Sequence, residues 1–454
     1  MFLDRELDER PDVPKGVAPD LPDVPAGEPQ SILVLGTDKR YGDEKAGKPV
    51  RSDTMMVVHL DPDRGSTAVM SLPRDLVVPI PGHGRGRINS AYATGGVGLA
   101  VKTVNELGFD VSHVVGVDFG GFQRVVNRLG CVYVDVDRRY FNDNDPPVAS
   151  ATNYATIDLR PGYQRLCGGD ALDFVRFRHL DDDFVRAARQ QEFLRQAKGQ
   201  IAVARAFGDR HELLKILADY SESDLAHASN AELFGLVKLV YAATRRPVRE
   251  VPFPATERRP DESLVVSPQR LQAAIERFEH LPAPAPRRSR AGGAPKRGNG
   301  GGTRSATGVV TDRVGGETHA LPIAAKLGDK LPVFYPRTRM SAGGYSRDSP
   351  RAYEIEHNGG GSHPAYRIVL SQGESGQYYG VQGTTWRSPP ILRGPHMTRR
   401  MRGRTYSVYS DGGRIRVVAW RSKRAVYWVS NTLSGRLSNA QMLAVARSLV
   451  RVGQ

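Results

Sequence analysis

Apolar residues in the first 280 positions form short runs that alternate with longer stretches of helical spacing. The short β-rich runs are bounded by turn residues, such as the Asp-Pro-Asp-Arg-Gly segment at 61–65, which favours a hairpin. We therefore predict strands at 32–35, 54–60, 67–72, 114–118 and 131–136. Near-helical spacing and helix-start residues predict helices at 95–108, 122–129, 171–177, 184–204, 213–218, 231–243 and 267–278.

The alternation of strands and helices predicts an α/β fold, a three-layer α-β-α domain with a central mixed sheet. The last third of the chain has a different pattern. Its predicted strands lie at 331–335, 366–370, 378–382, 406–409, 415–420 and 425–430. A helix is predicted at 438–450, where Ser438 and Gln441 resemble a capping box. This region is expected to form a smaller α+β C-terminal domain.

Composition gives the domain boundaries. Residues 1–30 are rich in Pro and Asp and are expected to be a disordered lead-in, followed by the α/β domain at 31–280. Residues 281–317 form a basic linker rich in Gly, Pro and Arg, and residues 318–454 form the α+β module, whose role the sequence leaves open. The linker is either a tether to an anionic wall or membrane or, as we slightly favour, a plain solvated spacer.

The charge balance predicts an anionic partner. The chain has a net charge of +15 and a pI of about 9.8. Nucleic acid, an acidic membrane surface and an anionic glycopolymer all fit such a charge, and the charge alone does not choose among them.

The two cysteines, Cys131 and Cys167, match no zinc pattern. One disulfide formed outside the cytoplasm and two unrelated buried thiols both remain open, and we favour the disulfide because both residues fall in one predicted domain. No apolar run approaches the roughly 18–20 residues of a transmembrane helix, and the N-terminus lacks the pattern of a signal peptide. The chain is therefore expected to be soluble unless an anchor is missing.

Charged residues gather at the ends of the predicted strands. Asp38 and Arg40 follow the first, Arg51 and Asp53 precede the second, and Arg74 follows the third. A second group lies between 176 and 190, namely Arg176, Arg178, Asp183, Arg186, Arg189 and Gln190. Strand alternation would put Arg176 and Arg178 on one face, and helical spacing would do the same for Arg186, Arg189 and Gln190.

Two carboxylates among several guanidinium groups suit a magnesium-dependent pyrophosphate site. Carboxylate oxygens bind the hard cation, and arginine grips phosphate oxygens in a bidentate manner. Taken singly, each Asp is better explained as a turn cap, and the basic helix as a solvated surface. No Walker spacing, Gly-x-Ser-x-Gly elbow or histidine metal pattern occurs, which argues against a nucleotide site, a serine hydrolase and a zinc site.

Ordered motifs resemble the LytR-CpsA-Psr family over residues 31 to about 280. They are Leu33-Val-Leu-Gly-Thr-Asp-Lys-Arg40, Arg51-Ser-Asp-Thr-Met-Met56, Ser71-Leu-Pro-Arg-Asp75, Arg87-Ile-Asn-Ser-Ala-Tyr92, the 114–122 segment, Gly168-Gly-Asp-Ala-Leu172 with Arg176-Phe-Arg178, and Asp183-Phe-Val-Arg186 followed by Ala-Ala-Arg-Gln-Gln191. The resemblance implies an extracytoplasmic, membrane-associated transferase. Such enzymes move a glycopolymer from a polyprenyl-pyrophosphate carrier onto peptidoglycan and form a phosphodiester.

The resemblance also implies roles for individual residues. Asp38 and Asp53 would hold Mg²⁺, and Asp183 would orient the cluster or take the proton of the acceptor hydroxyl. Pyrophosphate oxygens would be bound by Arg74, Arg176, Arg178, Arg186, Arg189 and Gln190, with Arg40, Arg51, Arg87 and Asn89 around them. A lipid tunnel could be lined by Leu99, Val104, Phe122, Val126, Phe193 and Leu194, although core packing explains each of these equally simply.

Three other functions remain open. A polyprenyl-pyrophosphate pyrophosphatase would use the same site without an acceptor. A noncatalytic wall-binding protein would use the linker and the C-terminal module. A nucleic-acid-binding regulator would need a recognition helix, which the sequence does not show clearly, so we expect no nucleic-acid partner.

Overall fold

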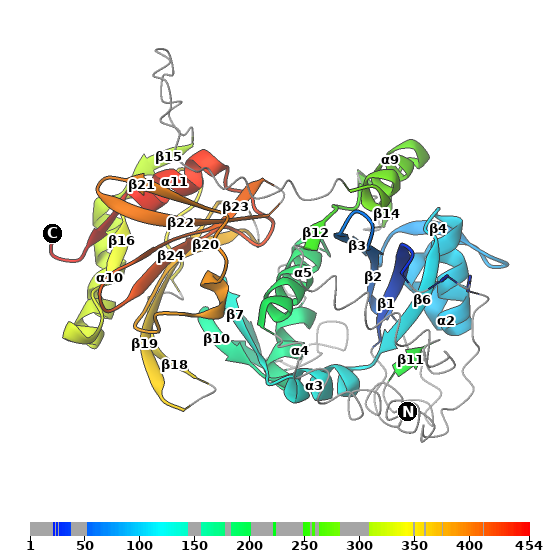
Figure 1. Cartoon of the computed structure of the whole chain (residues 1–454), viewed down its shortest axis with the longest axis horizontal. Coiled ribbons are helices and arrows are strands. Elements are labelled where there is room, and N and C mark those ends of the chain that lie inside the picture. The colour runs from blue at the N-terminus through cyan, green and yellow to red at the C-terminus, as the bar shows by residue number, and fades with distance from the viewer. Residues whose placement is uncertain are drawn as a thin grey trace, which may run out of the picture. The chain divides into compact units, whose positions relative to one another are not determined.

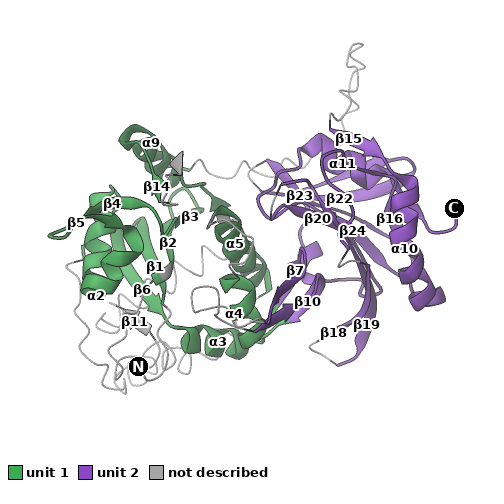
Figure 2. Cartoon of the chain, turned by 180° about the vertical axis from the view of Figure 1, so that it is seen from behind, with its two compact units in different colours: residues 1–132, 166–178, 182–283 green, residues 133–165, 179–181, 284–454 purple. Residues whose placement is uncertain are grey.

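The computed structural model describes residues 27–37, 52–143, 156–177, 183–200, 248–254, 263–281 and 308–454, with short pieces at 21–22, 24–25, 221–223 and 257–258. Within the last range, residues 348–349, 358–359, 375 and 412 are outside the description (Figure 1). The chain forms two compact units (Figure 2). Unit 1 contains residues 1–132, 166–178 and 182–283, and unit 2 contains residues 133–165, 179–181 and 284–454.

Unit 1 is built on a six-stranded mixed sheet with the order β11-β6-β1-β2-β3-β12. Its strands are β1 Gln30–Thr37, β2 Ser52–Asp61, β3 Ser66–Leu72, β6 Val111–Val117, β11 Ser221–Ser223 and β12 Val248–Glu250. The pairs β1–β6 and β3–β12 are parallel, whereas β1–β2, β2–β3 and β6–β11 are antiparallel. The β2–β3 hairpin turns where the sequence predicted it, because the Asp61 carboxylate accepts the Arg64 backbone N–H at 2.8 Å.

Helices cover both faces of this sheet, which confirms the predicted three-layer α-β-α arrangement. Alternate residues of β1 and β2, such as Leu33 and Val57, pack with α2 (Ile88–Glu106) and α9 (Pro268–Glu279) into one core. Residues that point the other way contact α5 (Asp183–Gln200). Gln190 donates to the Thr54 hydroxyl oxygen at 2.9 Å, and the amide oxygen of Gln191 accepts from the Ser71 hydroxyl at 2.9 Å.

Short elements complete unit 1, and those within residues 133–165 belong to unit 2. They are β4 Val77–Ile80 with β5 Gly84–Arg87, α3 Phe119–Arg128, β7 Val132–Val136 with β10 Gly162–Leu166, β8 Tyr140–Asn142 with β9 Ile157–Leu159, α4 Gly168–Arg176, and β13 Glu257–Arg258 with β14 Leu264–Val265. Residues 133–165, here called the excursion, leave unit 1 after β7 begins and return as β10 ends.

A disulfide closes the base of the excursion. Cys131 and Cys167 form it, 36 positions apart in sequence, with both residues in unit 1. We expect replacement of both cysteines by serine to lower the free energy of unfolding by about 2–4 kcal/mol, because the unfolded chain regains the entropy of an open loop. Denaturant unfolding monitored by circular dichroism measures this loss. Reductant should destabilise the parent chain and leave the double variant unchanged, and an equal effect on both would contradict the expectation.

Unit 2 contains a seven-stranded antiparallel sheet with the order β18-β19-β20-β24-β23-β22-β21. The strands are β18 Arg351–Glu356, β19 Ser362–Ser371, β20 Tyr378–Thr384, β21 Met397–Met401, β22 Arg404–Asp411, β23 Arg414–Arg421 and β24 Val426–Ser430. Around it lie β15 Val309–Thr311 with β17 Thr338–Met340, β16 Phe334–Pro336 with β25 Leu449–Arg451, the helices α10 Arg313–Leu327 and α11 Asn439–Arg447, and the 3₁₀ turns η2 Gly328–Lys330 and η3 Pro390–Leu392.

Both faces of the unit 2 sheet are buried. Along β24, Tyr427 and Val429 point into one core together with residues of α10 and α11. Val426 and Trp428 point into a second core, which Tyr133 and Tyr163 of the excursion help to form. The excursion, which the sequence assigned to the α/β domain, therefore supplies part of the core of the C-terminal module.

A buried ion pair fastens the excursion to the sheet. Arg367 of β19 is 0 % exposed, and its Nη1 lies 3.0 Å from Oδ1 of Asp135 in β7. The indole Nε1 of Trp428 donates to the same carboxylate at 3.3 Å. The Tyr353 hydroxyl donates to the Tyr163 carbonyl oxygen at 3.1 Å.

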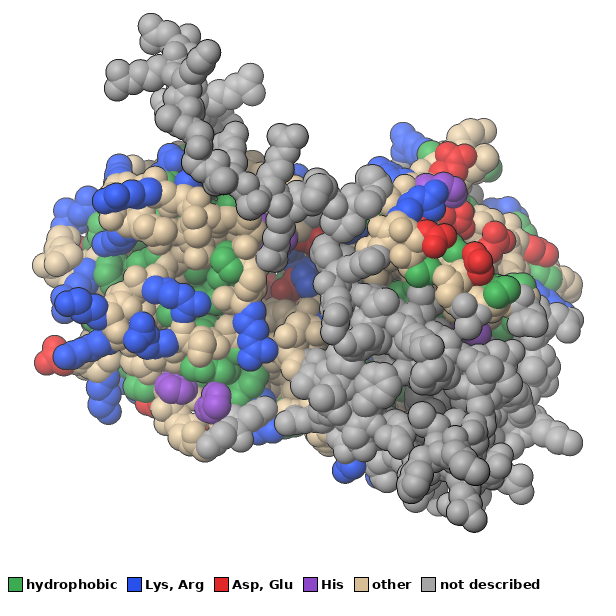
Figure 3. All heavy atoms as spheres, in the orientation of Figure 1, with side chains coloured by type: hydrophobic (Ala, Val, Ile, Leu, Met, Phe, Trp, Pro, Cys, Tyr) green, Lys and Arg blue, Asp and Glu red, His purple; other side chains and the backbone are tan. Residues whose placement is uncertain are grey.

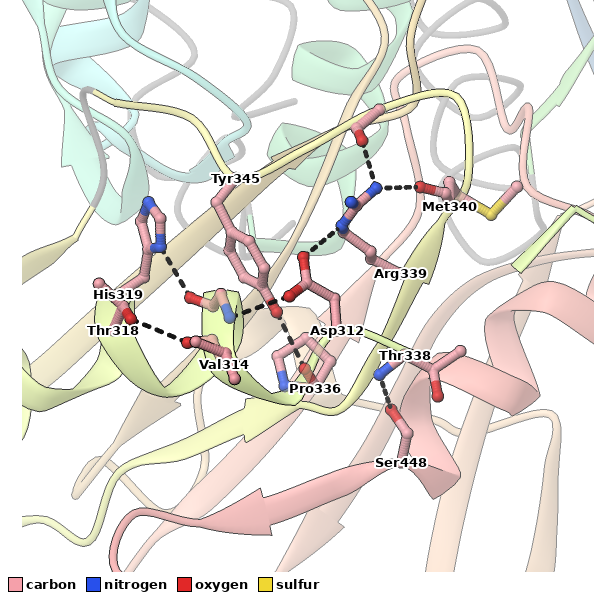
Figure 4. A network of polar contacts seen from close by, with 12 residues as sticks. Asp312, Val314, Thr318, His319, Pro336, Thr338, Arg339, Met340, Tyr345 and Ser448 are labelled. Atoms are coloured by element: carbon pink, nitrogen blue, oxygen red, sulfur yellow. Dashed lines mark hydrogen bonds and ion pairs between the residues drawn. The ribbon is translucent and has the colours of Figure 1, made fainter. Parts of the chain in front are cut away.

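Helix α10 was not predicted from the sequence. It begins at Arg313, inside the predicted linker, and it contains Gly315, Gly316 and Pro322, which obscure a helical pattern. Contacts hold it in place (Figure 4). Asp312 accepts the Gly315 N–H at 2.9 Å and pairs with Arg339 at 2.6 Å.

Other helices begin or end at residues that differ from the predicted ones. Helix α2 begins at Ile88, before the predicted 95, and continues across a kink at Gly95 and Gly96. The capping box of Ser438 and Gln441 is confirmed, but α11 ends at Arg447 because the chain then enters β25. The predicted helices at 213–218 and 231–243 lie outside the described residues. In the described part of the chain, no helix combines the length and the apolar character needed to cross a membrane.

Candidate functional site

The strand directions bring the predicted charges to one edge of the unit 1 sheet. Because β1, β3 and β6 run in the same direction and β2 runs against them, the carboxyl ends of three strands meet the start of β2. Thr37 at the end of β1 pairs with Ser52. The chain therefore leaves β1 and enters β2 at the same edge of the sheet.

Asp53 occupies a β-bulge at this edge. Gly36 pairs with Thr54 and Thr37 pairs with Ser52, so Asp53 is the extra residue between them. Bulges redirect a side chain and often lie beside functional sites. A Cβ atom on Gly36 would lie 3.0 Å from the Thr54 Cβ, which explains why the position facing the bulge is glycine.

Two arginines share one carboxylate just beyond β3. The Arg74 Nε lies 3.3 Å from Asp75 Oδ2, and the Arg87 Nη1 lies 3.2 Å from Asp75 Oδ1. The backbone joins the same two segments, because the Asn89 N–H donates to the Arg74 carbonyl at 3.3 Å. The structure therefore brings Arg74, Arg87 and Asn89 together. Sequence reasoning gave Asp75 no role, although its position after Pro-Arg was visible.

Helix α5 presents its predicted polar face to the sheet edge. Arg186 is 8 % exposed and Arg189 is 0 % exposed, so the simple explanation of a solvated basic surface does not apply to them. The Gln190 amide donates to Thr54 Oγ1 at 2.9 Å and to the Val175 carbonyl at 3.2 Å. Gln190 thereby joins α5, the end of α4 and the start of β2.

Arg189 is a supporting residue in this arrangement. Its Nη2 donates to the Phe177 carbonyl, and its guanidinium lies 5.7 Å from the Phe177 ring centroid and 6.0 Å from that of Phe174. This fully buried side chain therefore fixes the end of α4, where Phe177 is the C-cap residue.

Arg176 belongs to a helix and not to a strand. It is the last residue of α4, and its guanidinium lies 3.9 Å from the ring centroid of Phe119 in α3. The prediction that strand alternation sets its direction is therefore wrong, because helical hydrogen bonding continues through this residue. Stacking on an aromatic ring fixes the orientation of a guanidinium group.

The remaining predicted site residues are not described. Asp38, Arg40, Arg51 and Arg178 lie outside the described residues, as do the side chains of Asp53 and Asp183. Among the side chains that are described, no group of three or more metal-binding residues occurs. Binding of Mg²⁺ by Asp38 and Asp53 therefore stays a prediction from the sequence.

The residues suggested for a lipid tunnel divide between different surroundings. Val104 of α2 is fully buried in the core of unit 1, and Leu99 of the same helix packs against that core. Val126 of α3 is also buried. The rings of Phe122 in α3 and Phe193 in α5 lie 5.7 Å apart, and Leu194 is 42 % exposed.

A cavity of about 500 Å³ lies at the opposite end of the sheet. Its lining includes Ser31 at the start of β1, His59 near the end of β2, and Glu279 and His280 after α9. Ser31 Oγ and His59 Nδ1 lie 3.0 Å apart, and burial lowers the pKa of His59. This cavity is separate from the predicted site.

Asp173 in α4 makes the stability of unit 1 depend on pH. Burial raises its pKa from 3.8 to about 6, against the opposing effect of Arg176. The folded chain therefore binds more protons than the unfolded chain between about pH 4 and pH 6, and this contribution to stability is lost as the pH rises through that window. We expect Asp173→Asn to raise the free energy of unfolding at pH 7.5 by about 1 kcal/mol after allowance for solvent screening, with little change at pH 4. Denaturant titrations at both pH values measure the difference, and an equal effect at both would contradict it.

These features define a mixed α/β domain that brings several arginines to one edge of its sheet, two of them held by the Asp75 carboxylate, an arrangement suited to phosphate groups. The chain belongs to the LytR-CpsA-Psr family, because the family model described as the LytR_cpsA_psr family matches residues 12–276.

Relatives of known name support this assignment. The regulatory protein MsrR of Staphylococcus aureus is 33 % identical over 199 residues, covering 43 % of this chain and 56 % of MsrR. The polyisoprenyl-teichoic acid–peptidoglycan teichoic acid transferase TagT of Bacillus subtilis is 36 % identical over 171 residues, covering 37 % of this chain and 52 % of TagT. The chain thus spans about half the length of these curated relatives.

Solved structures show likeness as well. A structure described as TagT bound to LIIa-WTA is 26 % identical, with a TM-score of 0.44, and the match covers 59 % of this chain and 95 % of that one. A transcriptional regulator (EF0465) from Enterococcus faecalis is 23 % identical, also with a TM-score of 0.44, covering 57 % and 90 % of the two chains.

Proposed function

We propose that this chain is a phosphotransferase that moves an anionic glycopolymer from a polyprenyl-pyrophosphate carrier to a peptidoglycan hydroxyl, forming a phosphodiester in cell-wall assembly. Family membership and the transferase name of TagT support the reaction class. A disulfide in the domain fits the extracytoplasmic face of the membrane. The observation that carries the proposal is the Gln190–Thr54 contact, which places the arginine face of α5 beside the Asp53 bulge.

The proposed mechanism depends mainly on positioning and charge. Arg74 and Arg87, held by the Asp75 carboxylate, would bind pyrophosphate oxygens beyond the end of β3, while Arg176 and Arg186 approach from α4 and α5. The acceptor hydroxyl attacks the sugar-linked phosphorus, the new P–O bond forms, and polyprenyl phosphate leaves with the electrons of the broken bond. The proton of the hydroxyl passes to Asp183 at the start of α5.

Other residues would support these groups. Arg189 acts as a positioning residue through the Phe177 carbonyl, and Arg40, Arg51 and Arg178 would complete the cationic surroundings. Asp38 and Asp53 would hold Mg²⁺, which when bound would neutralise the charge that grows on the phosphate oxygens.

The test is transfer of a polyprenyl-pyrophosphate-linked glycan to peptidoglycan fragments by the purified chain. We expect transfer with Mg²⁺ and its loss with excess chelator, with recovery when Mg²⁺ is restored. Calorimetry with methylene diphosphonate should show binding that is stronger with Mg²⁺, which gives a readout besides activity. Equal transfer in chelator would contradict the metal role.

The same assay separates the alternatives. Release of phosphate without a peptidoglycan product would replace the transferase proposal with a pyrophosphatase. Absence of both products from a folded chain would favour a noncatalytic wall-binding or regulatory protein.

A further inference from the structure

The positive charge of the chain lies almost wholly outside the family domain. Residues 1–281 contain 36 Lys and Arg against 41 Asp and Glu, whereas residues 308–454 contain 22 against eight. From residue 375 to the end, 14 Lys and Arg accompany a single acidic residue, Asp411. The anionic partner that the net charge predicts is therefore expected to bind the C-terminal module.

Strand pairing concentrates this charge at one end of the unit 2 sheet. Met401 pairs with Arg404 where β21 turns into β22, and Tyr406 pairs with Trp420, so this turn and the β23–β24 turn lie at the same end. We call the charged residues of these two turns and of β21 the basic turn face. They are Arg399, Arg400, Arg402, Arg404, Arg421, Lys423 and Arg424.

The basic turn face is exposed and not neutralised by acidic residues in the described part of the chain. All of its residues except Arg404 are exposed, and within the described chain none of the seven forms an ion pair. Instead, Arg402 donates to the Arg447 carbonyl at 3.5 Å and Arg404 to the Leu449 carbonyl at 3.3 Å. Figure 3 shows how widely Lys and Arg side chains cover the visible face of unit 2.

The type of basic residue argues for recognition of anions. Residues 308–454 contain 19 Arg and only three Lys, whereas a surface selected for solubility mixes Lys with acidic residues. Charges on β21 also protect an exposed sheet edge from pairing with another chain. That explanation does not extend to Arg421, Lys423 and Arg424, because β23 and β24 are interior strands.

The residues around the basic turn face argue against nucleic acid and against membrane insertion as its function. No Phe, Tyr or Trp in the described part of residues 308–454 is exposed, so there is no platform on which nucleic-acid bases could stack. The exposed large apolar residues in the described part of unit 2 are Phe141 on β8, Val310 on β15, Val314 and Leu321 on α10, and Met397 on β21. Only Met397 shares a strand with the basic turn face, so this face lacks the cluster of apolar side chains that membrane insertion needs. A flexible carbohydrate polymer with recurring phosphodiester groups needs neither.

We propose that the basic turn face is an accessory binding site for an anionic, phosphodiester-linked glycopolymer, separate from the site in unit 1. Guanidinium groups spaced along the sheet end would grip successive phosphates, and the polymer would remain bound independently of the reaction at its reducing end. The proposal rests on the proposed function only for the identity of the polymer.

The test compares two variants of the full chain that each lose four positive charges. The first replaces Arg399, Arg400, Lys423 and Arg424 by glutamine. The control replaces Arg313, Lys326, Lys330 and Arg347, which are exposed elsewhere on unit 2. The probe is fluorescently labelled poly(glycerol phosphate), and its anisotropy is followed from 50 to 200 mM NaCl. Circular dichroism checks that both variants fold.

We expect the first variant to bind about tenfold or more weakly at 100 mM NaCl with a shallower salt dependence, and the control to change less than about threefold. Transfer from a carrier bearing a single repeat should stay unchanged in the first variant, so failure of the proposed function can be told apart from failure of this inference. Equal weakening of both variants would overturn the site. Tighter binding to phosphatidylglycerol vesicles or single-stranded DNA than to the polymer would overturn the choice of partner.

Discussion

Replacement of Asp135 by alanine is expected to lower the free energy of unfolding of unit 2 by about 3–5 kcal/mol, because it leaves the fully buried guanidinium of Arg367 without its ion-pair partner. The Trp428 indole N–H loses its acceptor in the same step. Denaturant unfolding, followed by the near-ultraviolet signal of the buried aromatic residues, measures the loss.

The excursion supplies a matched control. Asp158 lies on β9 and pairs with Arg139 at 2.8 Å, but its side chain is 42 % exposed. Asp158→Ala should therefore cost less than about 1 kcal/mol. The double variant Asp135→Met with Arg367→Met should regain most of the loss, because it removes both charges together. A loss for Asp135→Ala no larger than that for Asp158→Ala would show that the buried pair does not fasten the excursion.

Arg74→Ala is expected to reduce the rate of glycopolymer transfer by about 10²- to 10³-fold, in the range found when one stabilising group is removed from a developing anion. Its guanidinium is held by Asp75 at the sheet edge where the proposed phosphates bind. Initial rates with a polyprenyl-pyrophosphate-linked glycan measure the effect, and unfolding curves should match those of the parent chain.

Arg85→Ala is the control for this change. Arg85 lies on β5, two residues from Arg87, and it is exposed with only a 3.4 Å contact to the Val77 carbonyl. Its replacement should leave transfer within about twofold, because surface charges away from a site contribute little. Parallel losses in both variants would indicate a general charge effect and would remove Arg74 from the proposed site.

Local patterns explain why the sequence predicted β1, β2, β3 and β6 of the unit 1 sheet, but not the short strands β11 and β12. The Asp-Pro-Asp-Arg-Gly turn and the apolar runs on each side have a direct structural meaning, and β2 and β3 form around them. Helix α10 could not be predicted in this way. Its Gly316 is required by packing, since a Cβ atom there would lie 2.5 Å from the Tyr335 ring, and local propensity cannot register a distant neighbour.

For the candidate site as well, sequence spacing predicted some features, whereas others depend on contacts between distant segments. Spacing alone put Arg186, Arg189 and Gln190 on one helix face, and the Gln190–Thr54 contact shows where that face packs. The burial of Arg189 and the bulge at Asp53 depend on strand register and on the α4–α5 contact, neither of which a single sequence encodes locally. The sequence also did not predict that the excursion belongs to unit 2, because the residues that the excursion contacts lie about 200 positions away in the sequence.

The shared core of unit 2 changes what a cut in the chain would do. Cleavage between residues 282 and 307 would yield two polypeptides, yet Tyr133 and Tyr163 on one would still be embedded beside Trp428 of the other. The fragments would copurify as a nicked complex, and separate expression of the last 147 residues would leave an uncovered aromatic face prone to self-association.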